Sequence, residues 1–109
     1  MRDLASRKCK ACERGAEPLK ALEVENLLKE LDGWKLENGV IAKAFSFKNH
    51  YQAIAFVNAI AWISHREDHH PDLAVGYNTC TVSYHTHAIR GLSENDFICA
   101  AKVDALFEL

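Results

Sequence analysis

The 109-residue sequence has no long apolar run. Its most apolar stretch, residues 53–63, is interrupted by Asn58 and is far shorter than the roughly 20 residues that a membrane-spanning helix needs. The start of the chain reads MRDLASRKCKACERGAEP and lacks the apolar centre of a signal peptide. We therefore expect no membrane partner and a cytoplasmic location.

The chain also lacks an excess of charge of one sign. Thirteen Lys and Arg residues stand against fifteen Asp and Glu residues, which gives a formal net charge of −2. Such a chain has no general basic field with which to hold nucleic acid. We therefore expect no direct nucleic-acid partner.

Cofactor motifs and a disulfide framework are missing as well. The five glycines are scattered along the chain and form neither a phosphate-binding loop nor a dinucleotide fingerprint. In a reducing compartment, thiols rather than disulfides are expected for the four cysteines. These are Cys9, Cys12, Cys80 and Cys99.

What is present is the composition of one globular domain, with 49% hydrophobic and 26% charged residues. Residues 1–17 lack periodicity and are rich in charge, which predicts an N-terminal arm whose role stays open. Residues 18–109 are then expected to form a single domain.

The first half of this domain indicates a helix followed by a hairpin. Apolar residues recur at helical spacing over residues 18–31, with Pro18 suited to the first helical turn. Residues 34–47 predict two short strands joined at Asn38-Gly39, since Asn-Gly favours tight hairpin turns. The expected buried face of this hairpin comprises Trp34, Leu36, Ile41 and Phe45.

Asn49 is expected to cap a second helix that runs to about Arg66. This helix is apolar on more than one face, which in so small a domain suggests that one face forms a subunit interface. Assembly into a homo-oligomer is therefore expected.

The second half repeats the hairpin and the helix. Residues 72–77 and 79–86 predict two strands, and Ser93 with Asp96 predicts a capping-box start for the last helix. The predicted order is α-β-β-α-β-β-α. Because the turns within each hairpin are too short for parallel crossovers, we expect an α+β fold with a four-stranded antiparallel sheet and three helices.

Clustered histidines are the main functional signal. Five of the six lie within residues 65–87, and a group of imidazoles in one pocket can supply both a proton donor and a proton acceptor. His69 and His70 precede Pro71, which should direct their side chains apart as two walls of one cleft. His85 and His87 are expected to share a face if the strand reaches His87.

The candidate acid-base residues are therefore His69, His70 and His87. For His50 and His85 we expect plain polar surface roles.

A metal site is a competing interpretation. His65 and His69 are spaced i, i+4, and Cys9 and Cys12 could add thiolates. However, the residue after His65 is not the Glu of a zinc-protease helix, and the Cys pair has no partner pair at finger spacing. We therefore expect no metal, and zinc analysis of the purified protein would test this.

Several motifs together resemble the pterin-4a-carbinolamine dehydratase family over about residues 18–107. They are Leu-Asp-Gly-Trp at 31–34, His-His-Pro-Asp-Leu at 69–73, Val-Gly-Tyr-Asn at 75–78, Thr86-His87 and Gly-Leu-Ser-Glu-Asn-Asp at 91–96. The resemblance implies dehydration of 4a-hydroxytetrahydropterin, the by-product of aromatic amino acid hydroxylases, to quinonoid dihydropterin and water. This reaction supports tetrahydrobiopterin recycling and implies no metal or organic cofactor.

The resemblance also implies the site residues and the assembly. His69, His70 and His87 are expected to be catalytic and, with Asp96, to bind the pterin substrate. Asp96 is expected to cap a helix or orient a neighbour rather than carry a proton. A homodimer or homotetramer formed through helices is implied.

Two further points qualify the resemblance. His65 stands where relatives often have an acidic residue. Animal members of the family also act as dimerisation cofactors of a homeodomain transcription factor. A protein-interaction module, acting as a dimerisation cofactor or transcriptional co-regulator, is therefore the alternative function.

Overall fold

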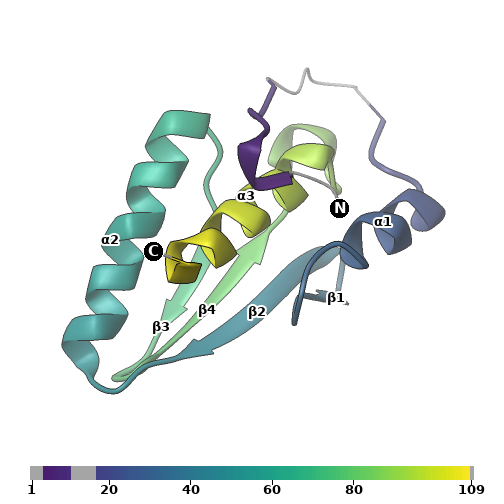
Figure 1. Ribbon diagram of the computed structural model, residues 1–109. Coiled ribbons are helices and arrows are strands. Elements are labelled where there is room, and N and C mark those ends of the chain that lie inside the picture. Colours follow the sequence, from purple (N-terminus) through teal and green to yellow (C-terminus); the bar gives the residue numbers. More distant parts are fainter. Residues whose placement is uncertain (1–3, 11–16, 109) are drawn as a thin grey trace.

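The structure is a computed structural model that describes residues 4–10 and 17–108 (Figure 1). Its α-helices and β-strands follow the predicted order α-β-β-α-β-β-α. They are α1 (Ala21–Leu28), β1 (Lys35–Glu37), β2 (Val40–Ser46), α2 (His50–Glu67), β3 (Asp72–Val75), β4 (Thr79–Tyr84) and α3 (Glu94–Ala105). The described residues also form three short 3-10 helices: η1 (Leu4–Ser6), η2 (His87–Ile89) and η3 (Leu106–Glu108).

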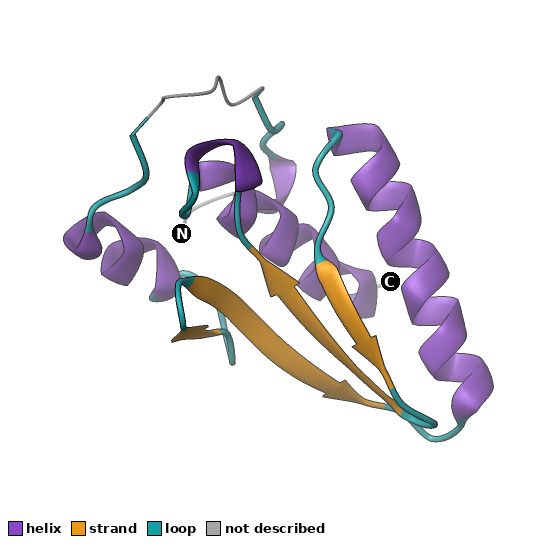
Figure 2. Cartoon of the chain, turned by 180° about the vertical axis from the view of Figure 1, so that it is seen from behind, coloured by secondary structure: helices purple, strands orange, loops and turns teal. Residues whose placement is uncertain are grey.

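The four strands form one antiparallel sheet in the order β1-β2-β4-β3, with the helices on one side of it (Figure 2). Alternation along β4 explains this arrangement, because its side chains point to opposite faces in turn. Cys80, Val82 and Tyr84 are fully buried toward the helices, whereas the residues between them are at least partly exposed. The predicted α+β fold is confirmed.

Local chemistry sets the turns and the helix starts as predicted. Asn38 and Gly39 both have positive φ, at 50° and 79°, as a tight hairpin turn requires. The Asn49 side chain accepts a 2.9 Å hydrogen bond from the Gln52 backbone amide and so caps α2. The Ser93 backbone amide donates to Asp96 Oδ2 at 2.9 Å at the start of α3.

Two predictions about the first half are wrong. The first helix begins at Ala21, because the Leu19 amide bonds the distant Leu92 carbonyl at 2.8 Å and holds the preceding segment outside the helix. Pro18 therefore lies before the first turn. Leu36 is half exposed, since β1 is a three-residue strand at the sheet edge; Trp34, Ile41 and Phe45 are buried as expected.

The described part of the arm, residues 4–10, lies against α3. Leu4 is almost completely buried in the core, and the Lys102 ammonium donates to the Ala5 carbonyl at 2.7 Å. Among the described residues, no helix is both long and apolar enough to cross a membrane.

Candidate active site

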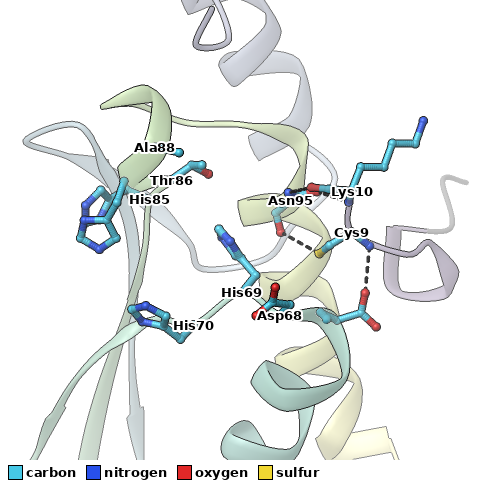
Figure 3. Close-up of a pocket in the computed structure, with 11 residues that line it drawn as sticks. Cys9, Lys10, Asp68, His69, His70, His85, Thr86, Ala88 and Asn95 are labelled. Atoms are coloured by element: carbon cyan, nitrogen blue, oxygen red, sulfur yellow. Dashed lines mark hydrogen bonds between the residues drawn. The ribbon is translucent and has the colours of Figure 1, made fainter. Parts of the chain in front are cut away.

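One pocket of about 510 Å³ collects four of the six histidines at an end of the sheet (Figure 3). Four segments line it: residues 9–10 of the arm, residues 67–70 at the end of α2, residues 85–88 after β4, and Asn95 in α3. Its volume lies within the range of small-molecule sites, about 300 to 1,000 Å³. The candidates His69, His70 and His87 all lie in its wall.

The end of α2 directs the first two histidines. Asp68 adopts a left-handed conformation (φ 51°, ψ 45°), which Asp tolerates better than most residues, and its amide bonds the Ser64 carbonyl. The chain therefore turns sharply before His69. As predicted, the two imidazoles take different partners: His69 reaches α3, and the His70 ring lies 5.9 Å from the His87 ring.

His69 is anchored by a buried carboxylate. Its Nε2 atom lies 2.6 Å from Oδ1 of Asp96, which is fully buried. The other oxygen, Oδ2, accepts hydrogen bonds from the Thr86 hydroxyl at 2.8 Å and from the Ser93 amide at 2.9 Å. Because a carboxylate only accepts, Nε2 of His69 carries the hydrogen, and Nδ1 is the nitrogen left for a ligand. Asp96 thus caps α3, as predicted, and also orients His69.

His87 is not on a strand, because β4 ends at Tyr84 and His87 opens the 3-10 turn η2. The turn, rather than strand alternation, brings the His85 and His87 rings to 4.1 Å between centroids. His85 therefore lines the pocket, which the sequence interpretation missed. Its spacing of two residues from His87 was the available signal.

The N-terminal arm forms a further wall that the sequence did not reveal. The Cys9 amide donates to Glu67 Oε1 at 2.8 Å, and the Lys10 amide donates to Asn95 Oδ1 at 2.9 Å. The Cys9 sulfur lies 3.5 Å from the sulfur of Cys99. These contacts tie the arm to both α2 and α3.

Glu67 supplies a negative charge where the arm meets the end of α2. Burial would raise the pKa of its carboxyl, but the hydrogen bond from Cys9 and the charges of Lys102 and Lys8 outweigh burial and lower it. Glu67 is therefore held as a carboxylate beside the arm.

The metal ligands considered from the sequence do not come together in the described part of the chain. The His65 ring lies 5.5 Å from the Trp62 ring and does not line the pocket. Cys12 lies outside the described residues. Cys9 and His69 share the pocket wall, but with His65 they form no group of metal-binding spacing.

Known proteins share this sequence and this fold. Proteins of Nitrosomonas eutropha and Nitrosomonas europaea are 68% and 66% identical over 105 and 107 residues, covering 95% and 97% of this chain and 93% and 95% of their own. Both carry the provisional name pterin-4-alpha-carbinolamine dehydratase. Their match covers the arm as well as the domain.

Two solved structures are similar. A "transcriptional coactivator/pterin dehydratase" from Brucella melitensis has a TM-score of 0.79 at 32% identity, covering 83% of this chain and 98% of its own. A "pterin dehydratase-like protein", described as a RuBisCO assembly factor in the alpha-carboxysome, has a TM-score of 0.56 at 26% identity, covering 67% and 84%.

The sequence profile of the family described as "Pterin 4 alpha carbinolamine dehydratase" matches residues 17–106. The match spans every α-helix and β-strand and all four candidate site residues. The chain therefore belongs to the pterin-4-alpha-carbinolamine dehydratase family.

Proposed function

We propose that this protein catalyses the dehydration of 4a-hydroxytetrahydropterin to quinonoid dihydropterin and water. The observation that carries the proposal is the placement of His69, His70 and His87 in one pocket, with His69 anchored by the buried Asp96. Membership of the family supports a pterin dehydratase. No metal or organic cofactor is part of the proposal.

The reaction needs one acid and one base. The bond between carbon 4a and its hydroxyl oxygen breaks as that oxygen receives a proton, and water leaves. The adjacent ring nitrogen gives up its proton, and its electron pair forms the new carbon–nitrogen double bond. Positioned acid-base groups typically contribute about 10²- to 10⁴-fold each to such a step.

We assign the base role to His69. Its Nδ1 takes the proton from the ring nitrogen, and the Asp96 carboxylate stabilises the positive charge that the imidazole gains. His87 then protonates the leaving hydroxyl. His70, whose ring faces that of His87 at 5.9 Å, orients the pterin by hydrogen bonding.

The proposal is tested by the rate of quinonoid dihydropterin formation from freshly generated 4a-hydroxytetrahydropterin. Wild type, His69→Ala and His87→Ala are compared with buffer, and His65→Ala serves as a matched histidine control outside the pocket. We expect acceleration by wild type and His65→Ala, and rates about 10²- to 10⁴-fold below that of wild type for the two pocket variants. A wild-type rate equal to that of buffer would refute the dehydratase.

The substrate and the assembly complete the proposal. An aromatic amino acid hydroxylase would supply the carbinolamine, so the two enzymes would act in sequence on the same pterin.

We propose a homodimer or homotetramer formed through α2. In the single chain, the α2 residues Tyr51 and Trp62 are 84% and 62% exposed. Light scattering coupled to size-exclusion chromatography tests this, and a monomer at micromolar concentration would overturn it. Free thiols at Cys9, Cys80 and Cys99 support a cytoplasmic site of action.

The second candidate function is binding of a protein partner as a transcriptional co-regulator. It is supported by the exposed aromatic residues of α2 and by the similarity to the Brucella melitensis protein, which is described as a transcriptional coactivator. The two functions are separated by two variants in a pull-down. Partner binding should survive His69→Ala and fail in Trp62→Ala, whereas catalysis in the dehydration assay should show the reverse.

A further inference from the structure

We propose that Asp72, His85 and His87 form a binding site for a divalent first-row transition-metal ion at the rim of the pocket, with zinc as the representative ion. In the described part of the chain, these residues are the one group whose ligand atoms lie close enough to share an ion, all within 4.8 Å of one another. Neither the family assignment nor the proposed dehydration requires such a site.

Strand register places two of the three ligands side by side. Asp72 of β3 pairs with Ser83 of β4. His85 comes directly after β4, two residues beyond Ser83, and lies diagonally beside Asp72. The distance from His85 Nδ1 to Asp72 Oδ2 is 4.0 Å.

The turn after β4 supplies the third ligand and holds it. Thr86, between the two histidines, is buried, and its hydroxyl contacts Ser93 at 2.7 Å and Asp96 at 2.8 Å. Its amide also bonds the Gly91 carbonyl at 2.8 Å. The backbone at His87 is therefore held, and the centroid of its ring lies 4.1 Å from that of the His85 ring.

The donor set suits zinc. Two imidazole nitrogens and one carboxylate oxygen are the protein ligands of many catalytic zinc sites, in which water completes the shell. Bonds of about 2.0 to 2.1 Å place ligand atoms about 3.3 Å apart in a tetrahedron, so ligand atoms that lie up to 4.8 Å apart must approach by up to about 1.5 Å. They can do so by side-chain rotation, because Asp72 is 68% exposed and both histidines reach solvent.

A second hollow, of about 320 Å³, lies along the same two imidazoles and leaves room for water ligands. Arg90 also lines this hollow. Its positive charge opposes a cation nearby and is expected to weaken binding. Replacement of Arg90 by alanine should therefore tighten the site.

Occupancy of the site has a consequence that depends on the proposed function. A metal bound to His87 occupies the nitrogen that would otherwise handle a proton, so the ion and the proposed dehydration exclude one another. Zinc is then an inhibitor of the reaction and not a cofactor. The ligand set itself is independent of whether the protein is a dehydratase.

The first experiment measures metal binding alone. Chelator-treated protein is titrated with zinc against a chromophoric chelator, using wild type, Asp72→Asn, His85→Ala and the matched control His65→Ala. We expect one ion per chain for wild type and His65→Ala, a loss of affinity of at least tenfold in the two site variants, and tighter binding in Arg90→Ala. Equal affinity in wild type and His85→Ala, or no binding by wild type, overturns the proposal.

A second measurement separates this site from the cysteines of the arm. The cobalt-substituted protein should lack the near-ultraviolet charge-transfer band of a thiolate ligand, and Cys12→Ser should bind zinc as wild type does. A thiolate band, or loss of binding in Cys12→Ser, would place the metal on the arm instead.

Inhibition is measured last. Zinc should slow dehydration by wild type at the concentration that fills the site, while Asp72→Asn should need at least tenfold more. If wild type has no dehydratase activity, the binding titration still decides the metal site, so the two proposals fail separately.

Discussion

The Nε2 atom of His69 lies 2.6 Å from Oδ1 of Asp96, and this contact joins the end of α2 to the first turn of α3. The same carboxylate accepts from Thr86, which precedes His87 in the chain. One buried side chain therefore sets the positions of two of the three proposed catalytic histidines. Small changes at Asp96 should affect both helix capping and the proposed chemistry.

Asp96→Asn is expected to lower the dehydration rate by about 10²-fold, because an amide does not stabilise a cationic imidazole as a carboxylate does. The free energy of unfolding should fall by about 1 to 3 kcal/mol, since a buried group that accepts three hydrogen bonds is altered. Ser93→Ala is the control. It removes the hydroxyl contact to Thr86 but keeps the backbone bond to Asp96, so it should cost about 1 kcal/mol and leave the rate per folded molecule unchanged. A wild-type rate in Asp96→Asn would disprove the assigned role.

Tyr84→Phe is expected to stabilise the fold by about 1 kcal/mol. The Tyr84 hydroxyl is buried, and no hydrogen-bond partner for it is found among the described residues. Removing an unsatisfied polar group removes its desolvation cost while the ring keeps its place against His69. Urea unfolding measures the change, and Tyr84→Leu should instead destabilise because the ring contact is lost. A stability loss in Tyr84→Phe would show that the hydroxyl has a partner.

Cys80 and Cys99 are expected to resist alkylation in the folded protein. Burial raises the pKa of Cys80, and the contact with Cys9 together with burial raises the pKa of Cys99, so neither forms the reactive thiolate readily. Mass spectrometry of peptides after a short iodoacetamide pulse should find both unmodified, and modified once denaturant is added. Cys9, which is only half-buried, provides the internal comparison and should react before Cys80 and Cys99. Equal labelling of Cys80 in the folded and unfolded states would contradict its burial.

Glu67→Gln should destabilise the protein near pH 7 by about 1 kcal/mol. The substitution removes the negative charge that accepts the hydrogen bond from the Cys9 amide and pairs with the Lys102 ammonium. The folded-state pKa of Glu67 lies below its ordinary value of 4.5, so the stabilisation is present above that value and is lost as pH falls through the folded-state pKa. The difference between wild type and Glu67→Gln should therefore shrink as urea midpoints are measured from pH 6 down to pH 3. A difference that is constant over this range would mean that the charge does not hold the arm.

Elements governed by neighbouring residues could be read from the sequence. The Asn38-Gly39 turn and the Asn49 cap depend on backbone preferences and hydrogen bonds that span three residues or fewer. The grouping of His69, His70 and His87 was also accessible, because the resemblance to the family fixed these positions together. Short-range chemistry and motif spacing thus predicted the fold and the three histidines.

Contacts between distant segments could not be read in this way. The start of α1 is set by the bond from Leu19 to Leu92, and the arm wall is set by the bond from Cys9 to Glu67, which lies 58 residues away. In both of these hydrogen bonds, the residues around one partner do not indicate which distant residue it will contact. His85 was missed because a single histidine is more often a polar surface residue, although its spacing from His87 placed the two on one face.

The pocket wall joins Cys9, in the N-terminal arm, to Asn95, in α3. During synthesis on the ribosome the arm emerges before the domain, yet part of the surface that receives it belongs to the last of the three α-helices to be made. The arm can meet Glu67 once α2 is made, but its contacts with Asn95 must wait for α3. The pocket therefore cannot close fully until α3 has been made.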